Sequence, residues 1–294
     1  MVSLMNLLLA AFRGVSSWTK DRRCRLGHGT ARGVAVILAT SALALMLQAP
    51  LRAQTAQSTG AANKAQHARA VCTIPRGPDA LWELAQCCSK SLAGNRDCRE
   101  YDPKFEYIIL KDNAPTKPDS YMIIPTKRIT GIEDREIFAM PFVDFWEYGW
   151  QRSRQYPGKP ASRTGMAINS AHARTQDQLH IHISCVRPDV SKILEARNRE
   201  IGTYPAEVVM LQLPPHNNTY RVVKVTRLRG TESPYEVIQV IPGVQRNMGD
   251  QSIAVVGSQK RDEYYVLETY YHGSDSGAAE ELLDETCKGA AGAP

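Results

Sequence analysis

A chain of 294 residues is long enough for one sizeable domain, or two small ones, together with an N-terminal leader. Its formal net charge is only +6, and much of that excess lies within the first fifty residues. The rest of the chain is therefore close to neutral, which argues against a nucleic-acid-binding surface.

Residues 1–53 are typical of an export signal or an N-terminal membrane anchor. A group of basic residues precedes the apolar run VAVILATSALALML, from Val34 to Leu47, and small residues follow near Ala49 and Ala53. Because the positive charges come before this run, we expect the following chain to lie outside the cytoplasm. Residues 54–70 are mostly small and polar, which is typical of a flexible tether.

Cysteine usage also favours export. Cys24 precedes the apolar run, and an even number of cysteines follow it, with no Cys-x-x-Cys pair among them. In an exported region this pattern indicates disulfides rather than metal ligands. We expect one bridge to join Cys185 and Cys287. Two further bridges, whose pairing the sequence leaves open, would involve Cys72, Cys87, Cys88 and Cys98.

One domain is expected over residues 71–288, followed by a short tail at 289–294. Its strands at 105–112 and 121–129 form a hairpin, and a helix with a broad aromatic face follows at 141–156. The next elements are two strands, a helix, three strands and a short helix, at 165–172, 178–186, 188–201, 220–228, 252–258, 263–271 and 277–287. Strands outnumber helices and the connections are short, so the expected class is α+β around an antiparallel sheet.

The strand QLHIHISCV, residues 178–186, alternates polar and apolar side chains. Alternation places Gln178, His180, His182 and Ser184 on one face, and the apolar residues between them in the core. The spacing alone leaves three interpretations open. They are polar groups on a solvated strand, a zinc site that needs further ligands, and a nucleophilic histidine whose neighbour fixes its tautomer.

The residues that flank this strand resemble the signature of the histidine-triad superfamily. In that signature an Asn is followed seven residues later by Gln, and four residues after that by the first of three alternating histidines. The corresponding residues in this chain are Asn169, Gln176, His180, His182 and Ser184. The hairpin LKDNAPTKPDSYMIIPTKRITGI is also similar to the N-terminal half of that superfamily.

The export leader, the serine in the third position and the long C-terminal extension together resemble the CDP-diacylglycerol pyrophosphatase family, a membrane-associated branch of the superfamily. The resemblance implies a histidine-triad-like antiparallel sheet with packed helices, disulfide bridges and a C-terminal extension. It implies hydrolysis of CDP-diacylglycerol in the bilayer to CMP and phosphatidate, with no metal or other cofactor. The expected location is the bacterial inner membrane, with the domain on the periplasmic side, or the periplasm if the leader is cleaved.

By position, the resemblance makes His182 the nucleophile that forms a cytidylyl-histidine intermediate, and makes His180 the residue that orders it. Ser184 takes the place of the third histidine, where a hydroxyl can donate a hydrogen bond but is a poor acid near neutrality. In an alternative register, Gln178, His180 and His182 form the triad and His180 is the nucleophile. The Asn and Gln offsets favour His182.

The resemblance also implies a set of residues around the ribose and the phosphates: Asp112, Asn169, Gln176, Arg174 and Arg187. Asp112 would bind ribose hydroxyls, for which a carboxylate offers two acceptor oxygens. Asp177 stands where many relatives have Ser or Thr. Its charge would repel a pyrophosphate unless Arg174 or Arg187 pairs with it.

Two other functions fit the sequence. The first is a histidine-triad hydrolase or transferase that acts on a soluble dinucleotide. The second is a non-catalytic, exported module that binds a nucleotide-lipid and whose triad has decayed at Ser184. The expected anchor or tether favours a substrate in a bilayer, at a membrane surface, over a soluble one.

Overall fold

The computed structural model describes residue 72 and residues 76–244, 247–273 and 277–289. These residues belong to one compact unit, Lys64–Pro294. The expected leader and tether lie outside the described residues, as does most of the expected tail. Within the described ranges, no helix has the length and apolar character that crossing a bilayer requires.

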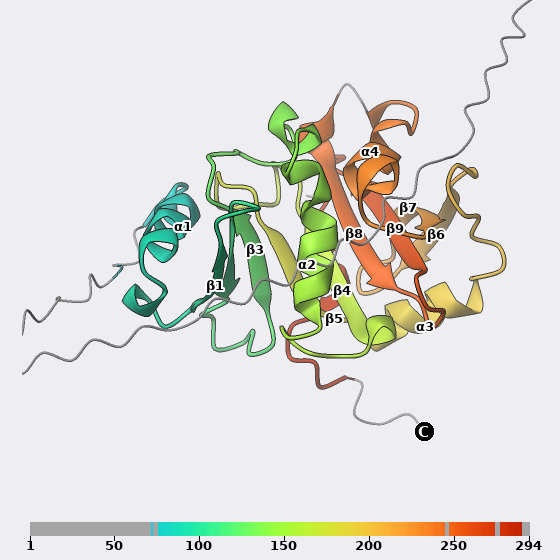
Figure 1. Ribbon diagram of the computed structural model, residues 1–294. Helices are drawn as coiled ribbons and strands as arrows, with labels where there is room; N and C mark the ends of the chain where they lie inside the picture. The colour runs from blue at the N-terminus through green and yellow to red at the C-terminus, as the bar shows by residue number, and fades with distance from the viewer. Residues whose placement is uncertain (1–71, 73–75, 245–246, 274–276, 290–294) are drawn as a thin grey trace, which may run out of the picture. The chain divides into compact units, whose positions relative to one another are not determined.

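The described residues form a ten-stranded sheet in which the strands pair antiparallel (Figure 1). Nine strands follow one path in the order β1-β2-β3-β5-β4-β8-β9-β7-β6, and β10 pairs with β5. Their bounds are β1 Cys98–Asp102, β2 Tyr107–Lys111, β3 Tyr121–Pro125, β4 Thr164–Ile168, β5 Ile181–Val186, β6 Val209–Leu213, β7 Asn218–Val225, β8 Gln251–Gly257, β9 Tyr264–Tyr270 and β10 Leu283–Asp284. The expected α+β class with an antiparallel sheet is confirmed.

The described part of the chain also forms four α-helices and several single-turn 3-10 helices. The α-helices are α1 Ala80–Lys90, α2 Phe145–Ser153, α3 Pro188–Ala196 and α4 Pro234–Gln239. The 3-10 helices are η1 Leu92–Gly94, η2 Arg135–Phe138, η3 Phe142–Asp144, η4 Ala161–Arg163, η5 Gly230–Glu232, η7 Met248–Asp250 and η8 Ala279–Leu282.

The sheet contains two halves with the same arrangement, although no repeat is evident in the sequence. Outward from the central β4–β8 pairing, one half runs β4-β5-β3-β2 and the other runs β8-β9-β7-β6. In the chain, α2 lies between β3 and β4, just as α4 lies between β7 and β8. Both helices pack on the same face of the sheet (Figure 1).

The main core forms between that face and the helices α2 and α4. Ile181 and Ile183 of β5 are fully buried there, together with Phe145 and Trp146 of α2. Burying an aliphatic side chain of this size contributes roughly 1.5–3 kcal/mol. Because successive strand residues point to opposite faces, this burial turns His182 toward the second face of the sheet.

The second face is covered by other segments in each half. In the half that contains β6–β9, the helix α3 packs its Val190 and Leu194 against the sheet, and Leu282 of η8 lies in the same cluster. In the half that contains β1–β5, the helix α1 packs against β2 and β3 through residues such as Leu84 and Ile108.

Three disulfides join segments of the fold within the described residues. Cys185 of β5 is bonded to Cys287, as expected from the sequence, and closes a separation of 102 residues. The pairing that the sequence left open is Cys72 to Cys87 and Cys88 to Cys98. These two bridges tie α1 to the chain on either side of it. The expected disulfide framework is confirmed.

The C-terminal helix expected over residues 277–287 is wrong. Only η8 is helical, and Leu283 and Asp284 instead pair with Val186 and Cys185 of β5. Cys287 has a φ of 49°, a left-handed conformation that an α-helix does not accommodate. The expected helices at 141–156 and 188–201 are present but shorter, at 145–153 and 188–196. The sequence patterns missed α1, β1, β6 and α4 altogether.

Candidate active site

The two histidines lie at the start of β5, a strand that is paired on both sides. His182 is opposite Met122 of β3 and Ala167 of β4. It is only 6% exposed, and its ring centroid lies 5.0 Å from that of His180. Neighbouring strands therefore hold His182 in place on the second face of the sheet.

Both imidazoles line a cavity of about 610 Å³. Its polar wall brings together most of the site residues expected from the sequence, namely Asp112, Asn169, Arg174, Gln176, His180 and His182. The apolar lining comes from α1, β2 and β3, and includes Leu81, Leu84, Leu110 and Met122. The cavity thus offers both polar and apolar surface to a ligand.

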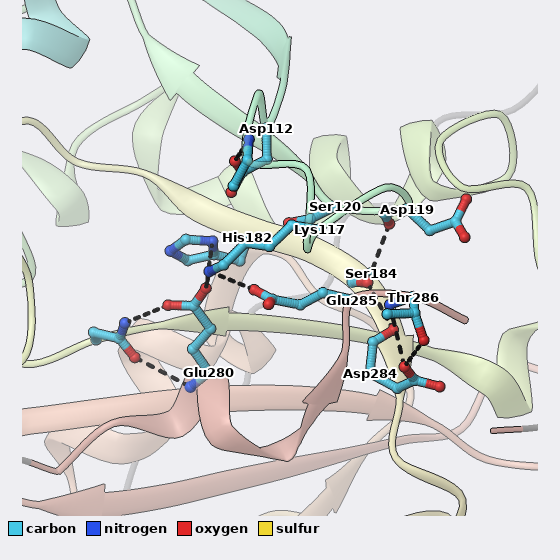
Figure 2. A network of polar contacts seen from close by, with 12 residues as sticks. Asp112, Lys117, Asp119, Ser120, His182, Ser184, Glu280, Asp284, Glu285 and Thr286 are labelled. Carbon is cyan, nitrogen blue, oxygen red and sulfur yellow. Dashed lines mark hydrogen bonds and ion pairs between the residues drawn. The ribbon is translucent and has the colours of Figure 1, made fainter. Parts of the chain in front are cut away.

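Two expected residues lie elsewhere. Ser184 is fully buried, and its hydroxyl lies 3.1 Å from the backbone oxygens of both Asp119 and Asp284 (Figure 2). Arg187 pairs with Asp189 at 2.7 Å and does not line the cavity. Position along β5 suggested that Ser184 lines the cavity, but its hydroxyl instead contacts the backbone of the β2–β3 connection and of β10.

His180 is oriented by a backbone carbonyl. Its Nδ1 lies 2.7 Å from the Gln178 oxygen, so the Nδ1 atom carries the hydrogen and the lone pair is on Nε2. Gln178 is itself fully buried, and its side-chain amide donates to the backbone oxygens of Pro125 and Lys127. Gln178 is therefore a structural anchor for the turn before β5. Burial lowers the pKa of His180.

His182 faces a carboxylate. Its buried Nδ1 lies 3.3 Å from Oε1 of Glu280, an ion-pair distance, without an aligned hydrogen bond to any described residue. Burial lowers the pKa of His182 to about 4, although the Glu280 charge opposes this shift. The imidazole is therefore neutral at pH 7, the form in which a ring nitrogen can act as a nucleophile.

Glu280 lies at the centre of a polar network (Figure 2). The Asn169 side-chain amide donates to Glu280 Oε2 at 2.9 Å, and the Glu280 backbone N–H donates to Asn169 Oδ1 at 3.1 Å. The Lys117 ammonium lies 2.7 Å from Glu280 and 2.6 Å from Glu285. In Figure 2 the Lys117 side chain reaches from the β2–β3 connection toward both carboxylates.

The two carboxyl groups of this network titrate differently. Burial, together with the hydrogen bond to Glu280, raises the pKa of Glu285 to about 7. Burial would also raise the pKa of Glu280, but its partners hold it well below its usual range. Because Lys117 is the partner that stays charged at neutral pH, it keeps Glu280 ionised. The Glu280 carboxylate can thus accept hydrogen bonds throughout the physiological pH range.

Sequence reasoning missed Lys117, Glu280 and Glu285. Lys117 and Glu280 are separated by 163 residues, and no offset within one strand or helix relates them. A possible signal was the cluster of acidic residues near Cys287 in GAAEELLDETC, because a bridge from Cys287 to Cys185 brings that cluster to the histidine strand.

Arg174 and Gln176 line the cavity and also contact neighbouring segments of the chain. Arg174 makes a two-pronged contact with Glu133, at 2.7 and 2.5 Å, and lies 3.3 Å from Asp177. The pairing expected to offset the Asp177 charge is therefore present. Gln176 accepts a hydrogen bond from the backbone of Leu81 at 3.2 Å, which ties α1 to the cavity.

Asp112 and Lys111 lie where β2 ends, at the edge of the cavity. Asp112 Oδ1 accepts a hydrogen bond from the Ala114 backbone at 2.9 Å. The Lys111 ammonium contacts the backbone oxygens of Asp112, Lys117 and Ser120, and burial lowers its pKa. Lys111 and Lys117 both line the cavity, and the Lys117 ammonium contacts Glu280 beside His182.

Solved structures offer only weak similarities. A DUF4931 family protein from Bacillus cereus superposes with a TM-score of 0.37 at 10% identity, over 58% of this chain and 83% of that one. Yeast Ap4A phosphorylase superposes with a TM-score of 0.37 at 13% identity, over 63% of this chain and 64% of the other.

Two proteins share a higher sequence identity with this chain than the solved structures do. A protein of Yersinia pestis named CDP-diacylglycerol pyrophosphatase is 31% identical over 222 residues, which cover 71% of this chain and 84% of that protein. A Mycobacterium leprae protein named probable CDP-diacylglycerol pyrophosphatase is 29% identical over 221 residues, covering 71% and 80%. The family model described as CDP-diacylglycerol pyrophosphatase matches residues 76–291, which include all the cavity residues described above. The chain belongs to the CDP-diacylglycerol pyrophosphatase family.

Proposed function

We propose that this protein is a hydrolase that cleaves the pyrophosphate bond of CDP-diacylglycerol to give CMP and phosphatidate, through a covalent nucleotidyl-histidine. One observation carries the proposal: two buried imidazoles line a single cavity together with the carboxylate of Asp112 and two lysines. The names of the relatives from Yersinia pestis and Mycobacterium leprae support the substrate.

In the proposed first step, Nε2 of His182 attacks the phosphorus that carries the cytidine. The N–P bond forms while the P–O bond to phosphatidate breaks, and phosphatidate leaves with the electron pair of the bridging oxygen. In the second step a water molecule attacks the same phosphorus, the electron pair of the N–P bond returns to Nε2, CMP is released with the oxygen of the water, and one proton goes to solvent. A neutral His182, which burial favours, is the form that this chemistry requires.

The serine in the third triad position is compatible with this chemistry. Phosphatidate is a phosphate monoester, and the second ionisation of such groups has a pKa of about 6. Its oxyanion can therefore leave without a proton, so that no acid is needed at Ser184. The negative charge that develops on the phosphates requires positive neighbours instead, and Lys111 and Lys117 line the cavity.

The apolar lining of the cavity, which includes Leu81 and Leu84 of α1, suits the lipid part of the substrate. In this proposal the enzyme works at a membrane surface, on the periplasmic side of the bacterial inner membrane. Three disulfides support an oxidising compartment. The apolar run in the leader supports either an anchor or a cleaved export signal.

The test uses the purified full chain and CDP-diacylglycerol in detergent mixed micelles, labelled in the cytidine-bearing phosphate. We expect labelled CMP, unlabelled phosphatidate, and an acid-labile labelled protein after rapid quenching. Cleavage of a soluble dinucleotide in preference to CDP-diacylglycerol would refute the lipid substrate. Binding of CDP-diacylglycerol without turnover would instead identify a non-catalytic nucleotide-lipid module.

A specific observation supports His180 as a second candidate nucleophile. Its Nδ1 lies 2.7 Å from a carbonyl acceptor, whereas the Nδ1 of His182 has a carboxylate at 3.3 Å without good alignment. Mapping the labelled histidine in the quenched protein by mass spectrometry distinguishes the two candidates. A label on His180 would show that the alternative register is the correct one.

A further inference from the structure

The position of the hydrogen on the His182 ring decides whether its Nε2 atom can act as a nucleophile. An imidazole attacks through Nε2 only when Nδ1 carries the hydrogen, and a hydrogen-bond acceptor normally fixes that tautomer. His180 has such an acceptor in a backbone carbonyl. The Nδ1 of His182 is buried without an aligned acceptor, but Glu280 Oε1 lies 3.3 Å away. Hydrogen bonds of this kind often tighten only when substrate binds.

Glu280 is held in position from several directions. Asn169 contacts both its carboxylate and its backbone, and Lys117 contacts Oε1. The side-chain groups of Asn169 and Lys117 that reach the carboxylate are donors, so the ionised form of Glu280 is the form that satisfies them. A carboxylate fixed in this way is a suitable acceptor for a further N–H group at Oε1.

The C-terminal segment, residues 277–289, fixes Glu280 relative to the strand that carries His182. Three residues beyond Glu280, β10 begins and pairs with the end of β5. Cys287 is bonded to Cys185 of β5, and the Glu285 backbone oxygen accepts from Asp119. The carboxylate and the imidazole are therefore both attached to β5, which limits their relative movement.

We propose that Glu280 is the positioning residue for His182: its carboxylate accepts the Nδ1 hydrogen and so directs the Nε2 lone pair into the cavity. This inference rests on the proposed function for the role of His182. When the N–P bond forms and the P–O bond breaks, the ring keeps its Nδ1 hydrogen and becomes positively charged. The Glu280 charge stabilises that ring. When water breaks the N–P bond the ring becomes neutral again, and no proton passes to Glu280.

The test compares Glu280→Gln with Glu281→Gln. Glu281 is a matched control because it lies on the same turn, η8, but its carboxylate contacts Asn218 at 3.0 Å and Tyr220 at 2.7 Å, outside the cavity. Each variant removes one negative charge. We expect Glu280→Gln to lower kcat by about 10²–10⁴-fold with little change in KM, and Glu281→Gln to keep the wild-type kcat.

The pH profile provides a readout that a purely structural role would not change. His182 is faced by the charges of Glu280, Lys117 and Asp112 and by the ring of His180, and Glu285 lies beyond Lys117. Loss of the Glu280 charge removes an interaction that favours the protonated ring. The acid limb of the profile therefore moves to lower pH in Glu280→Gln, and stays in place in Glu281→Gln.

A measurement without substrate separates this inference from the proposed function. In histidine-labelled protein, long-range ¹H–¹⁵N spectra report which ring nitrogen carries the hydrogen. We expect the Nδ1–H form of His182 in the wild type and in Glu280→Asp, and a mixture of tautomers in Glu280→Gln. Unchanged His182 signals and unchanged kcat in Glu280→Gln, or an equal loss in Glu281→Gln, would overturn the positioning role. A Glu280-dependent tautomer without hydrolysis of CDP-diacylglycerol would refute only the proposed function.

Discussion

The bridge between Cys185 and Cys287 should contribute more stability than either of the other two. In the chain-entropy model a disulfide stabilises the fold by restricting the unfolded chain, and its effect grows with the separation that it closes. That separation is 102 residues here, against 15 for Cys72–Cys87. The model gives about 4.7 kcal/mol for the long loop and about 3 kcal/mol for the short one.

The same bridge should matter for catalysis, because it holds the C-terminal segment on β5. Without it, the segment is attached through the two residues of β10, through the buried side chains of Leu282 and Leu283, and through the polar contacts of Glu280 and Glu285. Each of the two leucine side chains contributes roughly 1.5–3 kcal/mol, so the segment stays associated but moves more. Small displacements of catalytic groups cost activity steeply, and Glu280 would be displaced along with the segment.

The assay is urea unfolding of the double variant Cys185→Ala/Cys287→Ala, compared with Cys72→Ala/Cys87→Ala, together with kcat for CDP-diacylglycerol. We expect the first variant to lose about 1.7 kcal/mol more free energy of unfolding than the second, from the difference in loop length, and to lose more activity. An equal or smaller loss of stability in the first variant would refute the loop-length reasoning. A variant that is less stable but fully active would show that the bridge does not position the site.

Three further predictions concern the cavity. His182→Ala should lower kcat on the order of 10⁴-fold or more while the fold stays intact by circular dichroism; near-normal activity in His182→Ala with loss in His180→Ala would make His180 the nucleophile. Asp112→Asn should cost roughly 1–3 kcal/mol in kcat/KM for CDP-diacylglycerol, but little for a 2′,3′-dideoxyribose analogue, and equal losses on both substrates would remove Asp112 from the ribose site. Burial lowers the pKa of His182 to about 4, so the neutral ring persists as the pH falls through 6.5, and kcat should decline only near that lower value; a decline centred at 6.5 would contradict a buried nucleophile.

The sequence by itself determined which face of the sheet carries the histidines and several of the residues that gather around them. Apolar residues at every second position of β5 must enter the core, and this pattern alone fixes His182 on the opposite face. The offsets from Asn169 and Gln176 to His180 and His182 identified residues that do line one cavity. The even number of cysteines after the apolar run indicated disulfides, and the bridge expected between Cys185 and Cys287 is present.

Only the tertiary structure decided which residues complete the cavity. Residues 283–284 lie within a pattern typical of a helix, yet they pair with β5, because an available strand edge offers hydrogen bonds that local propensity does not anticipate. That pairing places the Asp284 backbone oxygen at the Ser184 hydroxyl and, with the disulfide, brings Glu280 beside His182. The contact between Lys117 and Glu280 spans 163 residues. Contacts of this kind depend on how the chain returns to the sheet, and no local periodicity encodes that path.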